Sequence, residues 1–171
     1  WVQTETGEVA SGLSLMKASV SDWQAFWGAW CFPLDAAYAV ALTDQGECEA
    51  ALGLLDAATE VGGSTGGHWW DAEFLRVRGK ALLGLQSSDT SEVRTSLDAA
   101  LAAARKREAR LFELRAATDL ANLILDEGDA SAAKVLLEPV VQSMPQGHDL
   151  LDIIVAHKTL GRCLNDHSRT E

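Results

Sequence analysis

The chain has 171 residues, an ordinary size for one domain, and 14 Lys and Arg against 25 Asp and Glu give it a net charge of −11. Its 47% hydrophobic content argues against disorder, and its 27 Ala and 24 Leu beside a single Tyr favour helices over a β-sandwich. No stretch of about 18 residues lacks charged or polar breaks, so we expect no membrane span. An acidic surface repels phosphate, so we also expect no direct binding of nucleic acid.

Apolar residues recur at helical spacing along the whole chain, and glycine- and proline-containing breaks divide it into segments of helical length. In chain order we expect the end of a helix over 1–6, a helix over 9–26, hairpins over 32–61, 68–106 and 108–144, and a last helix over 149–164. The last helix should dock through a stripe of Leu150, Ile153, Ile154, His157 and Leu160. The polar tail 165–171 should fray, and the whole chain should form one domain.

A repeat of about 40 residues underlies these segments, and it shows as small and large residues at fixed steps after a glycine. The four copies are Gly7, Gly12, Met16 and Ser19; Gly46, Ala51, Leu55 and Ala58; Val93, Leu97 and Ala100; and Gly128, Ala133, Leu137 and Val140. Their last positions follow one another at nearly equal steps. Two antiparallel helices approach closely only where both present small side chains, so Ala39 should face Ala51 and Ala121 should face Ala133. The sequence therefore predicts an all-α, TPR-like, right-handed solenoid of about four hairpins and a terminal helix.

Three stretches of the sequence resemble a known family. They are HWWDAEFLRVRGKALLGL (68–85), LDAALAAARKREARLFELRAATDLANLILDEGDASAAKVLLEPV (97–140) and QGHDLLDIIVAHKTL (146–160), and the most specific part is ELRAA at 113–117. They look like the C-terminal tetratricopeptide (TPR) region of large bacterial regulators, which are predicted ATPases fused to class III nucleotide-cyclase domains or to LuxR-type DNA-binding domains. The resemblance is weaker but collinear over residues 1–67. Met144 and Pro145 depart from it, because family members tend to carry aromatic residues there.

The resemblance implies a regulatory and assembly module rather than an enzyme. In this family the nucleotide-binding, cyclase and DNA-binding domains lie upstream of the matched region, so the expected partner is an upstream domain of the same polypeptide or another protein. The start at Trp1, without Met or an export signal, suggests a piece cut from a longer chain. Such a cut leaves a hydrophobic surface exposed at one end of the repeat array, and two copies could pair through it as a homodimer.

Positive charge gathers in the middle of the chain: residues 71–115 carry a net charge of +2, whereas residues 1–70 carry −8 and residues 116–171 carry −5. The basic residues of this segment are Arg76, Arg78, Lys80, Arg94, Arg105, Lys106, Arg107, Arg110 and Arg115. They could bind an acidic peptide, an anion or an acidic neighbouring domain. The alternative is a solvated helix face paired with Glu73, Asp98, Glu108 and Glu113. Arg115 in particular could form a structural ion pair with an acid such as Glu73 or Asp119.

All six tryptophans precede Asp71 in the chain: Trp1, Trp23, Trp27, Trp30, Trp69 and Trp70. Trp23, Trp27 and Trp30 share one helix face by their spacing. They are expected either to pack between hairpins or to form an exposed aromatic surface that meets a partner or a ligand.

The sequence gives only weak indications of a phosphate-binding, metal-binding or catalytic site. The loop Gly62–Gly67 lacks the strand and the Lys-Ser/Thr of a phosphate-binding loop, so we expect a plain connection between repeats. His148 and Asp152 could share a helix face, but a third metal ligand is not evident. Cys31, Cys48 and Cys163 contain no CxxC pair, which predicts reduced, buried thiols in a cytoplasmic protein. We expect no catalytic residue, no cofactor and no metal.

Two functional hypotheses remain. The first is a TPR-like module that mediates protein–protein or interdomain interaction in a bacterial ATPase or transcription regulator. The second is a small-ligand sensor with a metabolite in the superhelical groove, as in the related activator of maltose genes, whose helical superhelix binds a sugar. The tryptophan-rich N-terminal half motivates the second, because aromatic rings stack on sugars.

Overall fold

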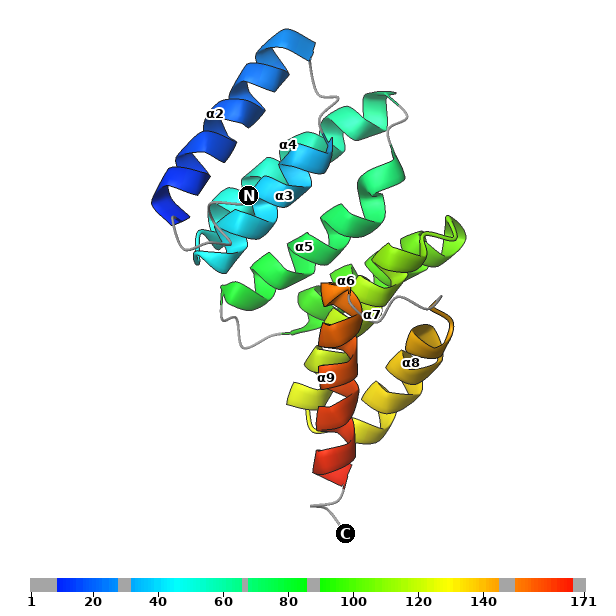
Figure 1. Cartoon of the computed structure of the whole chain (residues 1–171). Coiled ribbons are helices and arrows are strands. Elements are labelled where there is room, and N and C mark those ends of the chain that lie inside the picture. The colour runs from blue at the N-terminus through cyan, green and yellow to red at the C-terminus, as the bar shows by residue number, and fades with distance from the viewer. Residues whose placement is uncertain (1–8, 28–31, 66–67, 86–89, 145–149, 168–171) are drawn as a thin grey trace. The chain divides into compact units, whose positions relative to one another are not determined.

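The computed structural model describes residues 9–27, 32–65, 68–85, 90–144 and 150–167, and every regular element within them is a helix. Figure 1 shows the α-helices α2 (Val9–Trp27), α3 (Phe32–Asp44), α4 (Cys48–Thr65), α5 (Asp71–Gly84), α6 (Ser91–Lys106), α7 (Arg110–Asp126), α8 (Ala130–Gln142) and α9 (Leu151–His167), with a turn of 3-10 helix, η1 (His68–Trp70), before α5. The expectation of an all-α chain is confirmed for this part of the sequence.

Two helices run further than the sequence predicts. Helix α4 continues to Thr65 through two glycines that were expected in a loop, because glycine weakens a helix by about 1 kcal/mol without forbidding it. Helix α9 continues to His167 into the tail that was expected to fray. The expected segment 1–6 and the turn 86–89 inside the 68–106 hairpin lie outside the described residues, so the pairing of α5 with α6 stays a prediction.

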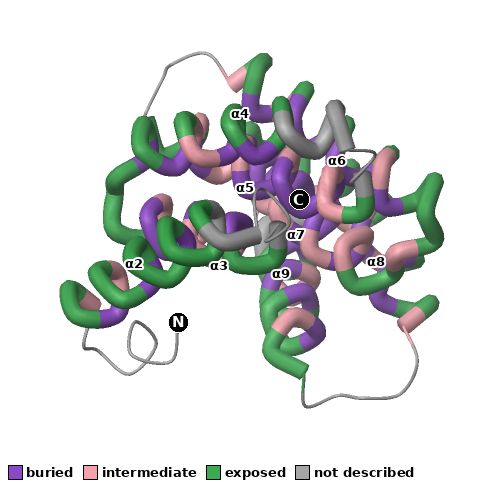
Figure 2. Tube along the Cα trace, turned by 90° about the horizontal axis from the view of Figure 1, so that it is seen from above, coloured by how far each residue is buried: buried purple, intermediate pink, exposed green. Residues whose placement is uncertain are grey.

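The chain divides into two compact units, of which the first is residues 1–93. In this unit α3 packs against α2, α4 and α5, and α4 also packs against α5. The core joins Ala36 and Ala39 of α3 to Ala51 and Leu55 of α4, and it includes Phe74, Val77 and Ala81 of α5. Helices α2 and α4 alternate buried and exposed positions, as the purple and green along the tube in Figure 2 show, whereas residues 35–43 of α3 and 71–82 of α5 are all buried or half-buried. Small residues thus stand where α3 and α4 meet, as the repeat pattern predicts.

The second unit is residues 94–171, in which α7, α8 and α9 pack pairwise against one another. Ala121 of α7 and Ala133 of α8 are both fully buried, which fits the close approach predicted for this hairpin. The large predicted residues Leu97 and Leu137 are buried as well.

Three tight turns share one backbone pattern. After α3, the N–H of Glu47 donates to the carbonyl of Leu42 at 2.9 Å; after α7, Asp129 donates to Ile124 at 3.1 Å; and after α6, Ala109 donates to Ala104 at 3.0 Å. Such a bond requires a left-handed residue just beyond the helix. Gly46 (φ 80°) and Gly128 (φ 92°) fill that position as predicted, whereas the third turn uses Glu108 (φ 54°).

Two packing predictions are wrong. Ser19, assigned to the small-residue position of the first repeat, is exposed, and Val20 is buried instead. The docking stripe of α9 is rotated: Ile153, Ala156, Thr159 and Cys163 are buried, whereas Leu150, Ile154 and His157 are exposed. The cause is that α9 packs against both α7 and α8. Close packing against two helices favours the side of α9 with the smaller side chains, which carries Ala156, Thr159 and Cys163.

Candidate partner-binding surface

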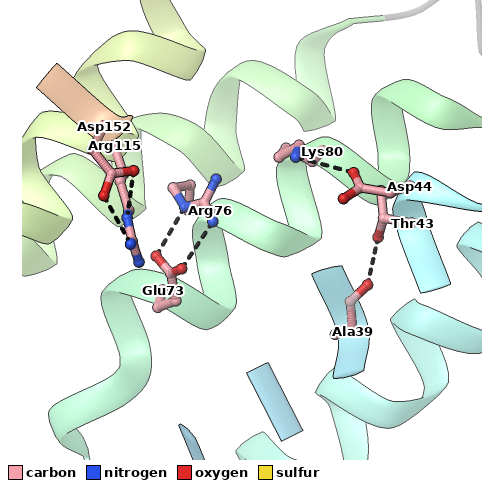
Figure 3. A network of polar contacts seen from close by, with 8 residues as sticks. All are labelled: Ala39, Thr43, Asp44, Glu73, Arg76, Lys80, Arg115 and Asp152. Carbon is pink, nitrogen blue, oxygen red and sulfur yellow. Dashed lines mark hydrogen bonds and ion pairs between the residues drawn. The ribbon is translucent and has the colours of Figure 1, made fainter. Parts of the chain in front are cut away.

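The basic residues of the first unit are held by acids of the same unit. Arg76 donates through Nε and Nη2 to both carboxylate oxygens of Glu73, each at 2.8 Å, and both side chains are buried in α5 (Figure 3). Arg78 pairs with Asp56 of α4, and Lys80 lies 3.5 Å from Asp44 of α3. Arg78 and Lys80 join α5 to other helices through acids that the alternative interpretation did not name. Arg76 has the partner Glu73 that it named, but the pair is buried and does not lie on a solvated face.

In the second unit, Arg105 Nε donates to Glu113 at 2.8 Å, and Arg94 pairs with Glu127. The first contact joins α6 to α7, and the second joins α6 to the residue that follows α7. Arg110 donates to the backbone carbonyl of Ser143, at the end of α8, at 3.0 Å. Arg94, Arg105 and Arg110 thus also link one helix to the next.

Arg115 is paired, but with an acid that the sequence did not nominate. Its Nε and Nη2 donate to Oδ1 and Oδ2 of Asp152, both at 2.9 Å, and both side chains are about 30% exposed (Figure 3). Glu73, one of the acids named from the sequence, pairs with Arg76. Asp152 was not among the predicted acids, because it reaches Arg115 only through the packing of α9 against α7.

Further along the same boundary, Asn122 of α7 accepts hydrogen bonds from Thr159 (3.3 Å) and Arg162 (2.7 Å) of α9, and Arg162 also donates to Asp126 at 3.0 Å. Sequence reasoning did not find this α7–α9 polar boundary. The sequence did contain a signal for it. Asp126 follows Asp44, and Arg162 follows Lys80, by the same number of residues that separates Gly128 from Gly46. The ion pair of Asp44 on α3 with Lys80 on α5 therefore recurs as that of Asp126 on α7 with Arg162 on α9.

The turn between α6 and α7 presents exposed positive charge. We call Lys106, Arg107 and Arg110 the basic corner, since all three are exposed around the left-handed residue Glu108. Lys106 and Arg107 lie at the C-terminal end of α6, where the helix dipole stabilises a cation, whereas Arg110 is the first residue of α7. Guanidinium and ammonium groups gathered in this way can bind carboxylates or other anions.

The tryptophans do not share one environment. Trp70 is partly buried and packs against the core of the first unit. Trp69, beside it in η1, is 74% exposed, and Trp23 on α2 is 39% exposed. Trp30 and Trp1 lie outside the described residues, as does the side chain of Trp27 at the end of α2. The described tryptophans thus differ in burial, and a shared aromatic surface of Trp23, Trp27 and Trp30 stays a prediction.

Exposed apolar side chains concentrate on α9 and the residue before it: Leu150, Leu151, Ile154, Val155 and Leu164. Apolar residues gathered on one helix favour contact with another protein surface more than scattered ones do.

Metal-ligating and nucleophilic groups are dispersed. In the residues that the structure describes, no group of three or more His, Cys, Asp or Glu could hold a metal ion, and His148 falls outside them. Cys48 and Cys163 are free thiols, both buried as predicted, and Cys31 lies outside the described residues. The described part of the chain also contains no helix with the length and apolarity needed to cross a bilayer.

Compared with protein-family models, with curated proteins and with solved structures, the chain gives no match. The functional argument therefore depends on its own residues.

Proposed function

We propose that the chain is a non-catalytic, TPR-like module that binds another protein, or another part of its own polypeptide, and regulates it. The observation that carries this proposal is the repetition of one hairpin, with the same turn at Gly46 and Gly128 and the same acid–base contact at Asp44–Lys80 and Asp126–Arg162. Arrays of hairpins bury a continuous core and leave long surfaces for partners. The resemblance to bacterial regulators supplies the context, a cytoplasmic ATPase or transcription regulator.

The basic corner is the part of the surface that we propose for contact with an acidic segment of the partner. The chain as a whole carries a charge of −11, so an acidic partner would be repelled by most of its surface. Lys106, Arg107 and Arg110 are exposed around one turn, so all three can present their charge to the same contact.

The test uses the domains encoded beside this chain in its gene, each expressed separately and titrated against it by calorimetry. One of them should bind, and its ATPase rate should change on binding. The charge-reversed variant Lys106→Glu/Arg107→Glu should weaken binding at least tenfold at low salt, because two attractions become repulsions. The matched control, Lys17→Glu/Lys134→Glu, makes the same change of net charge on α2 and α8 and should bind as the unmodified chain does.

Two results would contradict the proposal in different ways. Absence of binding together with an unchanged ATPase rate would overturn regulation of the chain's own polypeptide. Equal weakening by the two double variants would overturn the basic corner, because the effect would then be that of net charge alone. A metabolite that shifts tryptophan fluorescence and melting temperature without any bound domain would favour the sensor hypothesis. Trp69, which is 74% exposed, is then one aromatic ring on which such a ligand could stack.

A further inference from the structure

One side of α9 corresponds to a surface that is buried in the earlier hairpins. It carries Ile154, His157, Lys158 and Gly161, which recur at helical spacing, and we call it the open face of α9. Ile154 is 39% exposed, and His157 and Lys158 are exposed. A methyl group built on Gly161 would meet nothing within 4 Å, so the space in front of this small residue is empty.

The same positions in α7, one repeat earlier, are Leu114, Ala117, Thr118 and Ala121. All four are at most 4% exposed, and α7 packs against α8. In α3 the corresponding Asp35, Ala36 and Ala39 are equally buried, and the last two share a core with Ala51 and Leu55 of α4. The first helix of a hairpin thus uses this side to receive the second helix, and on α9 no described helix fills it.

Helix α2 has the complementary feature. It matches α4, the second helix of a hairpin one repeat further along the chain, so Leu15 and Ser19 correspond to Leu54 and Ala58. Leu54 packs on the core of the first unit and Ala58 belongs to that core, whereas Leu15 is 59% exposed and Ser19 is exposed. On α2, then, Leu15 and Ser19 are exposed to solvent, although their counterparts on α4 pack inward.

We propose that α9 of one copy of this chain receives α2 of a second copy, so that the two helices complete between molecules the hairpin interface that α3–α4 and α7–α8 form within one. The occupant is a second copy because α2 carries the required pattern. With Gly12 opposite Gly161, as Ala51 is expected to be opposite Ala39, Leu15 would lie opposite Lys158 and Ser19 opposite Ile154. The open face contains one lysine, Lys158, and no acidic residue, so it needs little charge compensation.

This contact joins two different surfaces, so it is heterologous and each copy keeps one surface for a further copy. A single pair of helices buries less than the roughly 800 Å² per partner of a standard interface, so the association should be weak and concentration-dependent. The inference does not rest on the proposed function, because it concerns copies of this chain and uses neither the basic corner nor an upstream domain.

Analytical ultracentrifugation of two single variants tests the proposal. Ile154→Glu removes the receiving surface and Leu15→Glu removes the inserted one. Each variant alone should stay monomeric at concentrations where the average mass of the unmodified chain rises steadily. A mixture of the two should form a 1:1 dimer and go no further, because only one functional α2 and one functional α9 surface remain. Val135→Glu on α8 is the matched control, since Val135 is 73% exposed and its counterpart Gly53 also has empty space before it.

Three results would overturn the proposal: a mass that stays monomeric at every concentration, a mixture that fails to associate, or association abolished by Leu15→Glu and untouched by Ile154→Glu. The last would indicate a symmetric contact of α2 with α2. Helical circular dichroism checks that each variant folds, and Ile154→Ser with Leu15→Ser repeats the experiment with smaller perturbations. Loss of association in the Val135→Glu control would likewise contradict the assignment.

Discussion

Arg162 of α9 donates to Asp126 of α7 at 3.0 Å, and the same contact joins Lys80 to Asp44 two repeats earlier in the chain. These side chains are between one third and two thirds exposed. Exposed pairs of this kind contribute only about 0.2–1 kcal/mol to the free energy of unfolding. We therefore interpret the recurring pair as a contact that aligns neighbouring helices and adds little stability. Stability depends more on Glu73 and Arg76, whose side chains are only 5% and 10% exposed.

Removing one partner of the buried pair should therefore cost far more than removing one partner of the exposed pair. We expect Glu73→Ala to lower the free energy of unfolding by about 3 kcal/mol, because the Arg76 guanidinium stays buried without that carboxylate. Asp126→Ala should cost less than about 1 kcal/mol. Urea unfolding measures both, with tryptophan fluorescence for the first unit, which contains all six tryptophans, and circular dichroism for the second. Equal losses would mean that burial does not decide the energetics of these pairs.

The two turns that flank α7 should respond to substitution with opposite signs. Gly128 has φ 92°, so Gly128→Ala should destabilise the second unit by about 1–2 kcal/mol. Glu108 occupies the same turn position with φ 54°, so Glu108→Gly should stabilise by up to about 1 kcal/mol. Thermal unfolding followed by circular dichroism gives both signs. Asp98→Gly, in the middle of α6, is the control for the general cost of glycine and should be destabilising.

Local features of the fold could be predicted from the sequence, whereas contacts between distant segments could not. Gly46 and Gly128 mark the positions of two turns in the sequence, and Asp129, directly after Gly128, caps α8 by accepting from the N–H of Ala132 at 2.9 Å. Glu108 gave no such signal, because its left-handed backbone is imposed by the two helices that it joins. The partner of Arg115 depends on which helix packs against α7, and 25 acids offer too many candidates.

The same limit explains the error on α9. The predicted stripe on α9 is apolar except for His157 and consists of Leu150, Ile153, Ile154, His157 and Leu160. The helix has a second stripe, which consists of Ile153, Ala156, Thr159 and Cys163. Its smaller side chains suit a helix that packs against two neighbours. Periodicity identifies an amphipathic helix, and packing then selects the buried side. The basic corner could be predicted only in part. The sequence shows the excess of positive charge in residues 71–115, whereas the exposure of Lys106, Arg107 and Arg110 depends on the turn between α6 and α7.

Gly84 ends α5 against α4, where a methyl group in its place would lie 2.5 Å from Sγ of Cys48. Cys48 is buried, so we expect Gly84→Ala to cost about 1–2 kcal/mol through overpacking. With Cys48→Ala also present the sulfur is gone, and alanine becomes neutral or stabilising at position 84, because it favours helix over glycine by up to about 1 kcal/mol. A double-mutant cycle from urea unfolding, followed by tryptophan fluorescence, measures this coupling. Additive effects would show that the two residues do not meet.

Tyr38 is the only tyrosine, so its ionisation can be followed alone by absorbance at 295 nm. Burial, and secondarily the negative charge of Glu47, raise the pKa of Tyr38 above 10.0. The unfolded chain ionises this phenol first, so its contribution to stability is complete below pH 10 and is lost as the pH rises through the folded pKa. Glu47→Gln should lower the titration midpoint but leave it above that of the chain unfolded in urea, because burial remains. Tyr38→Phe should remove this component of the alkaline loss of stability. A folded midpoint equal to the unfolded one would contradict the burial of the hydroxyl group.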